Sequence, residues 1–173
     1  TEAEIRPQVS GIIKERFFDE GATVKAGQPL YKIDDVTYVA AVNSARATVA
    51  EAQADYDLAV IEANRAQGLF EGQSGSASNR DKAVGQRNKA DAVLKSAKAK
   101  LTSAEIDQER TTIRASIDGV IGFSQTTPGA LVAAQQTTAL TTIRTLDPVY
   151  VDVTQSATEL LAWNRPEGKP PEN

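Results

Sequence analysis

The feature that most constrains this chain is an apolar repeat that runs without interruption through residues 38–70. Its members recur alternately four and three positions apart, and none of them is a charged or amide residue. This spacing places one narrow seam along a helix, and the seam needs a partner helix. At about 1.5 Å rise per residue the helix is about 50 Å long. The repeat consists of Tyr38, Val42, Ala45, Val49, Ala52, Tyr56, Ala59, Ala63, Ala66 and Phe70.

A second stretch keeps the same spacing and supplies the partner. Residues 71–76, between the two, are rich in turn formers. The sequence therefore predicts an antiparallel helical hairpin over residues 35–112, with its tip at about 72–77. Two helices of an ordinary bundle are the alternative, but a bundle helix needs a wider apolar face than this seam. The second seam consists of Ala83, Arg87, Ala90, Leu94, Ala97, Leu101, Ala104 and Gln108.

Charge supports the pairing of these two segments. Residues 35–71 hold six acids and two bases, a net charge of −4, whereas residues 77–112 hold five acids and eight bases, a net charge of +3. Flanking charges of opposite sign favour two helices that lie together. The many alanines in both seams allow the two backbones to approach closely, so that dispersion contacts replace bulky side chains.

Composition excludes several classes of function. The 173 residues include no His and no Cys, which removes the commonest general base, the thiolate nucleophile and zinc–thiolate sites. The net charge of −4 argues against a nucleic-acid partner. The pair Asp34 and Asp35 is explained better as a helix N-cap than as a catalytic dyad. Lys25 and Lys32 are expected to be plain surface charges. We therefore expect no enzyme activity, no cofactor and no metal.

Short strand patterns flank the hairpin, and the second set repeats the first. Residues 114–121 match residues 6–13, Gly129 falls where Gly21 does, and Leu140 to Ile143 matches Leu30 to Ile33. Glycines at matching places suggest matching tight turns. The sequence therefore predicts an α+β protein in which residues 4–34 and 113–143 form one small β-sandwich, with the α-helical coiled-coil hairpin inserted between the halves.

The two halves resemble those of a lipoyl or biotinyl domain. In carriers of that type a tight hairpin with the modified lysine joins the halves, whereas here the helical hairpin occupies the joint. A split lipoyl domain with an inserted α-hairpin is similar to the periplasmic adaptors, or membrane fusion proteins, of tripartite resistance-nodulation-division (RND) efflux pumps. The resemblance is carried by residues 6–11, Ile33-Asp34 with Tyr38, Gly119, residues 129–132, and the run 146–156, which resembles the entry into the adaptor β-barrel.

This resemblance implies partners and a location. It implies a non-enzymatic adaptor that bridges an inner-membrane RND drug/proton antiporter and an outer-membrane channel of the TolC type, and that seals the conduit for drug export. It also implies a hexamer in the periplasm of a Gram-negative bacterium, attached to the inner membrane. Residues 144–173 would then be the start of the β-barrel domain and a disordered or truncated end, with a short helix over 156–163, and the chain would be a fragment.

The family also implies a contact site at the tip. An Arg, a Leu four residues on and a Ser seven further on meet the outer-membrane channel, and Arg65, Leu69 and Ser76 have this spacing. From residue type and position alone, we would expect Arg65 to be a solvated helix charge, Leu69 to be a contact that closes the hairpin, and Ser76 to be a cap for the second helix. Three other functions remain open: an adaptor of type I secretion or ATP-driven efflux, a lipoyl or biotinyl carrier, and a structural coiled coil.

Overall fold

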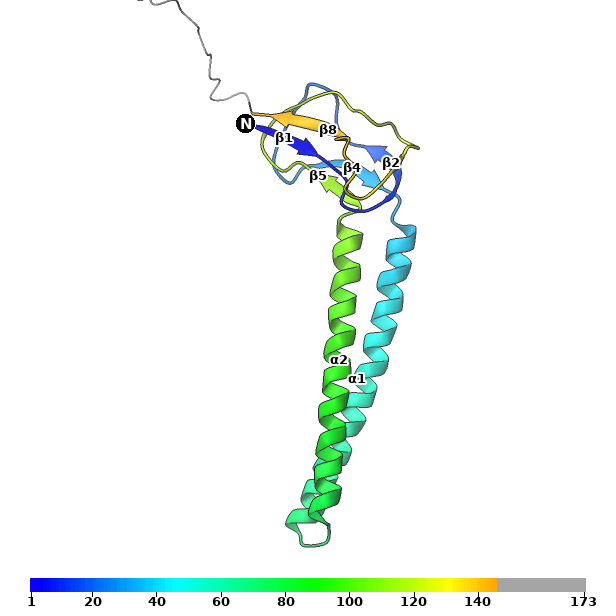
Figure 1. Ribbon diagram of the computed structural model, residues 1–173, viewed down its shortest axis with the longest axis vertical. Coiled ribbons are helices and arrows are strands. Elements are labelled where there is room, and N and C mark those ends of the chain that lie inside the picture. The colour runs from blue at the N-terminus through cyan, green and yellow to red at the C-terminus, as the bar shows by residue number, and fades with distance from the viewer. Residues whose placement is uncertain (146–173) are drawn as a thin grey trace, which may run out of the picture.

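A small β-sandwich from which one long helical hairpin projects makes up the computed structural model, which describes residues 1–145 (Figure 1). The predicted fold class is confirmed for this part of the chain. The predicted barrel entry at 146–156 and the helix over 156–163 lie outside the described residues. The strands are β1 (Glu2–Ile5), β2 (Gly11–Arg16), β3 (Thr23–Val24), β4 (Pro29–Ile33), β5 (Thr112–Arg114), β6 (Gly119–Ile121), β7 (Leu131–Val132) and β8 (Thr141–Arg144).

The two halves of the β-sandwich are interlocked. One sheet has the strand order β1-β8-β6-β3 and the other β5-β4-β2-β7, with all pairs antiparallel. Each sheet takes two strands from either side of the hairpin, and the second order reproduces the first when each strand is replaced by its counterpart in the other half. The matching turns are also present, because Gly21 (φ 78°) and Gly129 (φ 91°) both adopt the left-handed conformation.

An apolar core fills the space between the sheets. Tyr31 is fully buried, and its ring meets Phe18 edge to face with 5.2 Å between the ring centroids. The Tyr31 hydroxyl lies 2.6 Å from Ser124 Oγ, and burial raises the pKa of this phenol. Burial of these aromatic and branched side chains stabilises the sandwich from which the hairpin projects. The most deeply buried side chains are Pro7, Ile13, Val24, Leu30, Tyr31, Ile33, Thr111, Ile121, Leu140, Thr141 and Ile143.

Helices α1 (Val36–Glu71) and α2 (Ala77–Glu109) lie side by side over their whole length (Figure 1). Every residue of both predicted seams is buried or half-buried, including the polar Arg87 and Gln108. Ala52, Leu94 and Ala97 form a small core cluster midway along the pair, and Val49 and Tyr56 pack against it. Near the sandwich, an ion pair of 3.2 Å between Arg46 and Glu105 joins the two helices. The 4-3 apolar repeat therefore correctly predicted which face of each helix is covered by the other.

The junction between sandwich and hairpin differs from the sequence-based expectation. Lys32 is not a plain surface charge, because its Nζ donates to Thr111 Oγ1 (3.0 Å) and Thr112 Oγ1 (3.3 Å) across the β4–β5 pair. The same Nζ lies 2.8 Å from Asp35 Oδ2. Asp35 is the N-cap residue of α1 by position, but its side chain makes no capping bond. Instead, Asp34 Oδ1 accepts from the Val36 N–H at 3.3 Å.

Candidate functional site at the hairpin tip

The turn between α1 and α2 occupies residues 72–76 and is closed by backbone hydrogen bonds. The Gly72 N–H donates to the Gly68 carbonyl (3.0 Å), the Gln73 N–H to the Phe70 carbonyl (3.0 Å), and the Ser74 N–H to the Leu69 carbonyl (2.9 Å). Bonds of this kind satisfy the last carbonyls of a helix. The tip is therefore a defined turn rather than a loose loop.

Ser76 begins α2. Its backbone is extended (φ −90°, ψ 149°), and its Oγ accepts from the Asn79 N–H at 3.2 Å. Both features are those of an N-cap serine, which satisfies one of the free N–H groups of the first turn. The reading of Ser76 as a cap is therefore confirmed, and the Ser76 hydroxyl hydrogen is not used in this bond.

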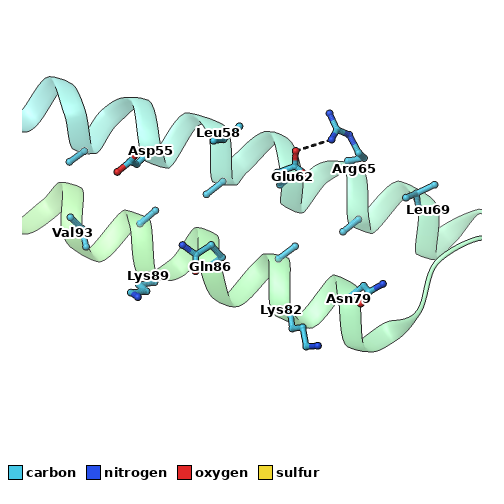
Figure 2. Close-up of a pocket in the computed structure, with 15 residues that line it drawn as sticks. Asp55, Leu58, Glu62, Arg65, Leu69, Asn79, Lys82, Gln86, Lys89 and Val93 are labelled. Carbon is cyan, nitrogen blue, oxygen red and sulfur yellow. Dashed lines mark hydrogen bonds and ion pairs between the residues drawn. The ribbon is translucent and has the colours of Figure 1, made fainter.

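Arg65 and Leu69 lie one helical turn apart near the end of α1. Figure 2 shows Arg65 directed away from α2, with its guanidinium paired to Glu62 in the same helix at 2.8 Å. The Arg65 side chain is 62% exposed, and Leu69 is 49% exposed. An ion pair this exposed contributes little to stability. Both side chains therefore present much of their surface to solvent near the tip of the hairpin.

A groove of about 860 Å³ runs along one face of the distal hairpin, and Arg65 and Leu69 line its tip end (Figure 2). The α1 wall carries Asp55 and Glu62, and the α2 wall carries Lys82 and Lys89. The structure thus brings Arg65 and Leu69 to one surface, whereas Ser76 lies beyond it in the turn. The other lining residues are Ala52, Leu58, Ala59, Ala66, Asn79, Ala83, Gln86, Ala90 and Val93.

The ionisable side chains of this groove are spread along its two walls. Within residues 1–145, no three or more Asp or Glu side chains gather as they would around a metal ion. The titratable groups of the groove sit on exposed helix faces, where water screens their charges. No described helix is both long enough and apolar enough to cross a membrane.

Two features of the tip were not identified from the sequence. The Arg80 guanidinium stacks over the Phe70 ring at 4.3 Å, a cation–π contact that joins the ends of the two helices. Gln73 adopts φ 58°, the left-handed conformation that usually favours glycine. The Phe70–Arg80 spacing across the turn could have suggested the first contact. No sequence signal places Gln73, since Gly72 and Gly75 are the more obvious candidates for a left-handed residue.

A β-sandwich that carries a coiled-coil hairpin between its two halves is an architecture that known proteins share with this chain. Residues 1–144 match the family model described as "RND MFP, barrel-sandwich hybrid domain", where MFP denotes membrane fusion protein. Over 159 residues, the chain is 45% identical to the multidrug efflux pump subunit AcrA of Escherichia coli (strain K12), covering 92% of this chain and 40% of AcrA.

A second relative and a solved structure agree with this match. The membrane fusion protein MtrC of Neisseria gonorrhoeae is 45% identical over 169 residues, which is 96% of this chain and 41% of MtrC. The crystal structure of a MacA-MexA chimeric protein that contains the Pseudomonas aeruginosa MexA α-hairpin domain has a TM-score of 0.64 and 29% identity, and covers 84% of this chain and 48% of that chain.

The chain belongs to the barrel-sandwich hybrid family of RND membrane fusion proteins. It spans about two fifths of the length of the curated relatives AcrA and MtrC, at 40% and 41%. The match favours the RND family over adaptors of type I secretion or ATP-driven efflux. A carrier would have a tight turn with its lysine between β4 and β5, and the chain has α1 and α2 at that place.

Proposed function

We propose that the protein is a non-enzymatic periplasmic adaptor of a tripartite efflux pump. It bridges an inner-membrane RND antiporter and an outer-membrane channel, and it seals the path along which drugs leave the cell. The observation that carries the proposal is the hairpin itself, a projecting pair of helices whose tip presents Arg65, Leu69 and Ser76 in a family that includes a multidrug efflux pump subunit. Energy for export comes from the transporter.

The tip has the chemistry to dock onto the helical ends of a channel. Arg65 offers a planar fork of donors to the carbonyl groups that close a facing helical turn, and its exposed pair with Glu62 is readily exchanged. Leu69 supplies a small apolar contact. Ser76 keeps one O–H donor, because its cap bond to Asn79 uses the oxygen only as an acceptor.

Copies of the adaptor are proposed to surround the conduit side by side, as a hexamer attached to the inner membrane. The acidic α1 and the basic α2 support this arrangement, because α1 of one copy would then face α2 of the next. Analytical ultracentrifugation of the full-length protein at 50 mM and 500 mM NaCl tests it. Association should weaken at high salt. A species that stays monomeric at both salt concentrations would contradict the arrangement.

The docking role is tested by reversing the charge of Arg65. Arg65→Asp in the full-length protein should abolish drug resistance and channel cross-linking while helicity and expression are unchanged. Lys95→Asp is a matched control, because Lys95 is also an exposed cation of the hairpin (74%) and pairs with an acid of its own helix, Asp91, at 2.7 Å. It should have little effect on resistance or cross-linking.

Two outcomes would change this assignment. If Arg65→Asp retains full resistance and full cross-linking to the channel, the tip is not the docking surface. If Lys95→Asp is equally damaging, the shaft of the hairpin rather than its tip is the sensitive surface, and lateral packing of hairpins becomes the critical contact.

A further inference from the structure

The apex of the hairpin holds a glutamine in a conformation that favours glycine. Gln73 has φ 58°, whereas Gly72 beside it has φ −78°, a value that any residue adopts. Gly75 lies close to the end of α1, since a Cβ there would come within 3.1 Å of Leu69 Cβ and of the Phe70 nitrogen. The one position of the turn where glycine would relieve the backbone therefore carries an amide side chain instead.

The side chain of Gln73 does nothing for the hairpin within the described residues. Its backbone N–H is fixed by the Phe70 carbonyl at 3.0 Å, but its amide forms no hydrogen bond with any of residues 1–145. Gln73 is exposed, and the turn between α1 and α2 to which it belongs lies at the end of the hairpin farthest from the sandwich (Figure 1). A strained residue that the surrounding fold does not use is a candidate for a functional contact.

We propose that Gln73 is a further channel-binding residue whose amide pairs with an exposed backbone peptide of a facing helical turn. A glutamine side chain carries both a donor and an acceptor, so it can donate to a free C=O or accept from a free N–H of a facing helical turn. The turn holds the Gln73 backbone in place, so that binding needs to order only its side chain. This inference rests on the proposed adaptor function and adds an uncharged, directional contact to those of Arg65, Leu69 and Ser76.

The chain provides its own control residue. Gln135, in the loop between β7 and β8, is the other non-glycine residue with a positive φ in residues 1–145, at 56°. In the internal repeat, Gln135 occupies the position equivalent to Gly27, which also has a positive φ (83°). Gln135→Gly therefore repeats the same chemical change in the same backbone conformation, on the sandwich rather than at the tip.

The test measures binding of full-length variants to a purified TolC-type channel in detergent by surface plasmon resonance. Gln73→Gly should weaken binding about five- to tenfold, the loss expected for one or two neutral hydrogen bonds. Its helicity by circular dichroism should equal that of the unmodified protein, because glycine suits this backbone. Gln73→Asn, which keeps an amide and tolerates the left-handed conformation, should bind better than Gln73→Gly. Gln135→Gly should bind like the unmodified protein.

The outcomes separate this inference from the adaptor function. If the unmodified protein and Gln73→Gly bind the channel equally well, Gln73 is not a contact, although the docking role of the tip stands. Equal losses in Gln73→Gly and Gln135→Gly would also overturn the inference, since they would show a general effect of the substitution. If the unmodified protein does not bind the channel at all, the proposed function fails, and Gln73 with it.

Discussion

Two glycines of this chain, Gly119 and Gly68, should respond to substitution by alanine in opposite ways. A Cβ on Gly119 in β6 would lie 2.5 Å from the Arg144 carbonyl oxygen of the neighbouring strand, so the two backbones would have to separate. Gly68 lies in α1 with open space around the position of a Cβ. The same change to alanine therefore meets a collision at Gly119 and none at Gly68.

Gly119→Ala is expected to lower the free energy of unfolding by about 1–3 kcal/mol, the usual cost of overpacking. Gly68→Ala is expected to raise the stability of the hairpin by about 1 kcal/mol, the difference in helix propensity. Urea unfolding followed by circular dichroism measures both changes. A destabilised Gly68→Ala would mean that the hairpin needs this glycine for something other than its fold.

Acid sensitivity is predicted at the junction, where the hydrogen bond from Lys32 lowers the pKa of Asp35. A carboxyl whose pKa is lower in the folded protein than in the unfolded chain adds stability above the unfolded value of about 3.9, and this stability is lost as pH falls through the folded pKa. Asp35→Asn should therefore cost stability at pH 6 and little at pH 2.5. The difference should stay within about 1 kcal/mol, because water reaches the pair. Urea midpoints of both proteins at the two pH values give the result, and an equal cost at both would contradict it.

At the scale of elements, the sequence predicted the hairpin because the apolar spacing that forms it lies within each helix and can be read from neighbouring residues. A 4-3 apolar spacing determines which face of each helix is covered, and the seams from Tyr38 to Gln108 are covered as predicted. The same reasoning failed at Lys32, whose partners Thr111 and Thr112 are near only after β4 and β5 pair. It also could not place the left-handed residue of the turn, since that choice depends on how α1 and α2 close around Gly75.

The distal part of the hairpin is expected to open more readily than the middle. The seam of this distal part is mostly alanine, and the distal part also contains both helical glycines, Gly68 and Gly85. In the middle of the hairpin, by contrast, Leu94, Val49 and Tyr56 pack together. Less apolar area is buried per turn toward the tip, and the helix propensity is lower. Local opening should therefore cost less free energy there.

Hydrogen exchange followed by mass spectrometry tests this gradient. Amides of residues 59–70 and 80–90 should exchange faster than those of residues 42–56 and 92–104. The double variant Gly68→Ala/Gly85→Ala should slow exchange in the first group and leave the second unchanged. Uniform exchange along both helices would show that the hairpin opens as one unit.

For the whole molecule, the internal repeat predicted one sandwich from two distant halves. The two sheets confirm this, because each contains strands of both halves and their strand orders correspond when each strand is replaced by its counterpart. The repeat could not assign strands to sheets, because β3 pairs with β6 and β2 with β7 only through contacts between the halves. The hairpin leaves from one place, between the paired strands β4 and β5. It therefore replaces what would otherwise be a tight turn.

Replacing residues 34–110 by Asn-Gly should accordingly leave a folded β-protein. The Ile33 N–H donates to the Thr111 carbonyl (2.8 Å) and Lys32 pairs with Thr112, so Ile33 and Thr111 are positioned as the last residues of a β-hairpin. Asn-Gly is the favoured two-residue connection between such strands. The variant loses the packing of Tyr38 against the core and its bond to the Ser10 carbonyl, so it should be about 1–3 kcal/mol less stable than the sandwich of the complete chain. Circular dichroism should show a β spectrum with a cooperative thermal transition, and proton NMR should show dispersed amides.

An insoluble or disordered product would contradict an independently folding sandwich, provided that a second variant with a Gly-Asn connection behaves in the same way.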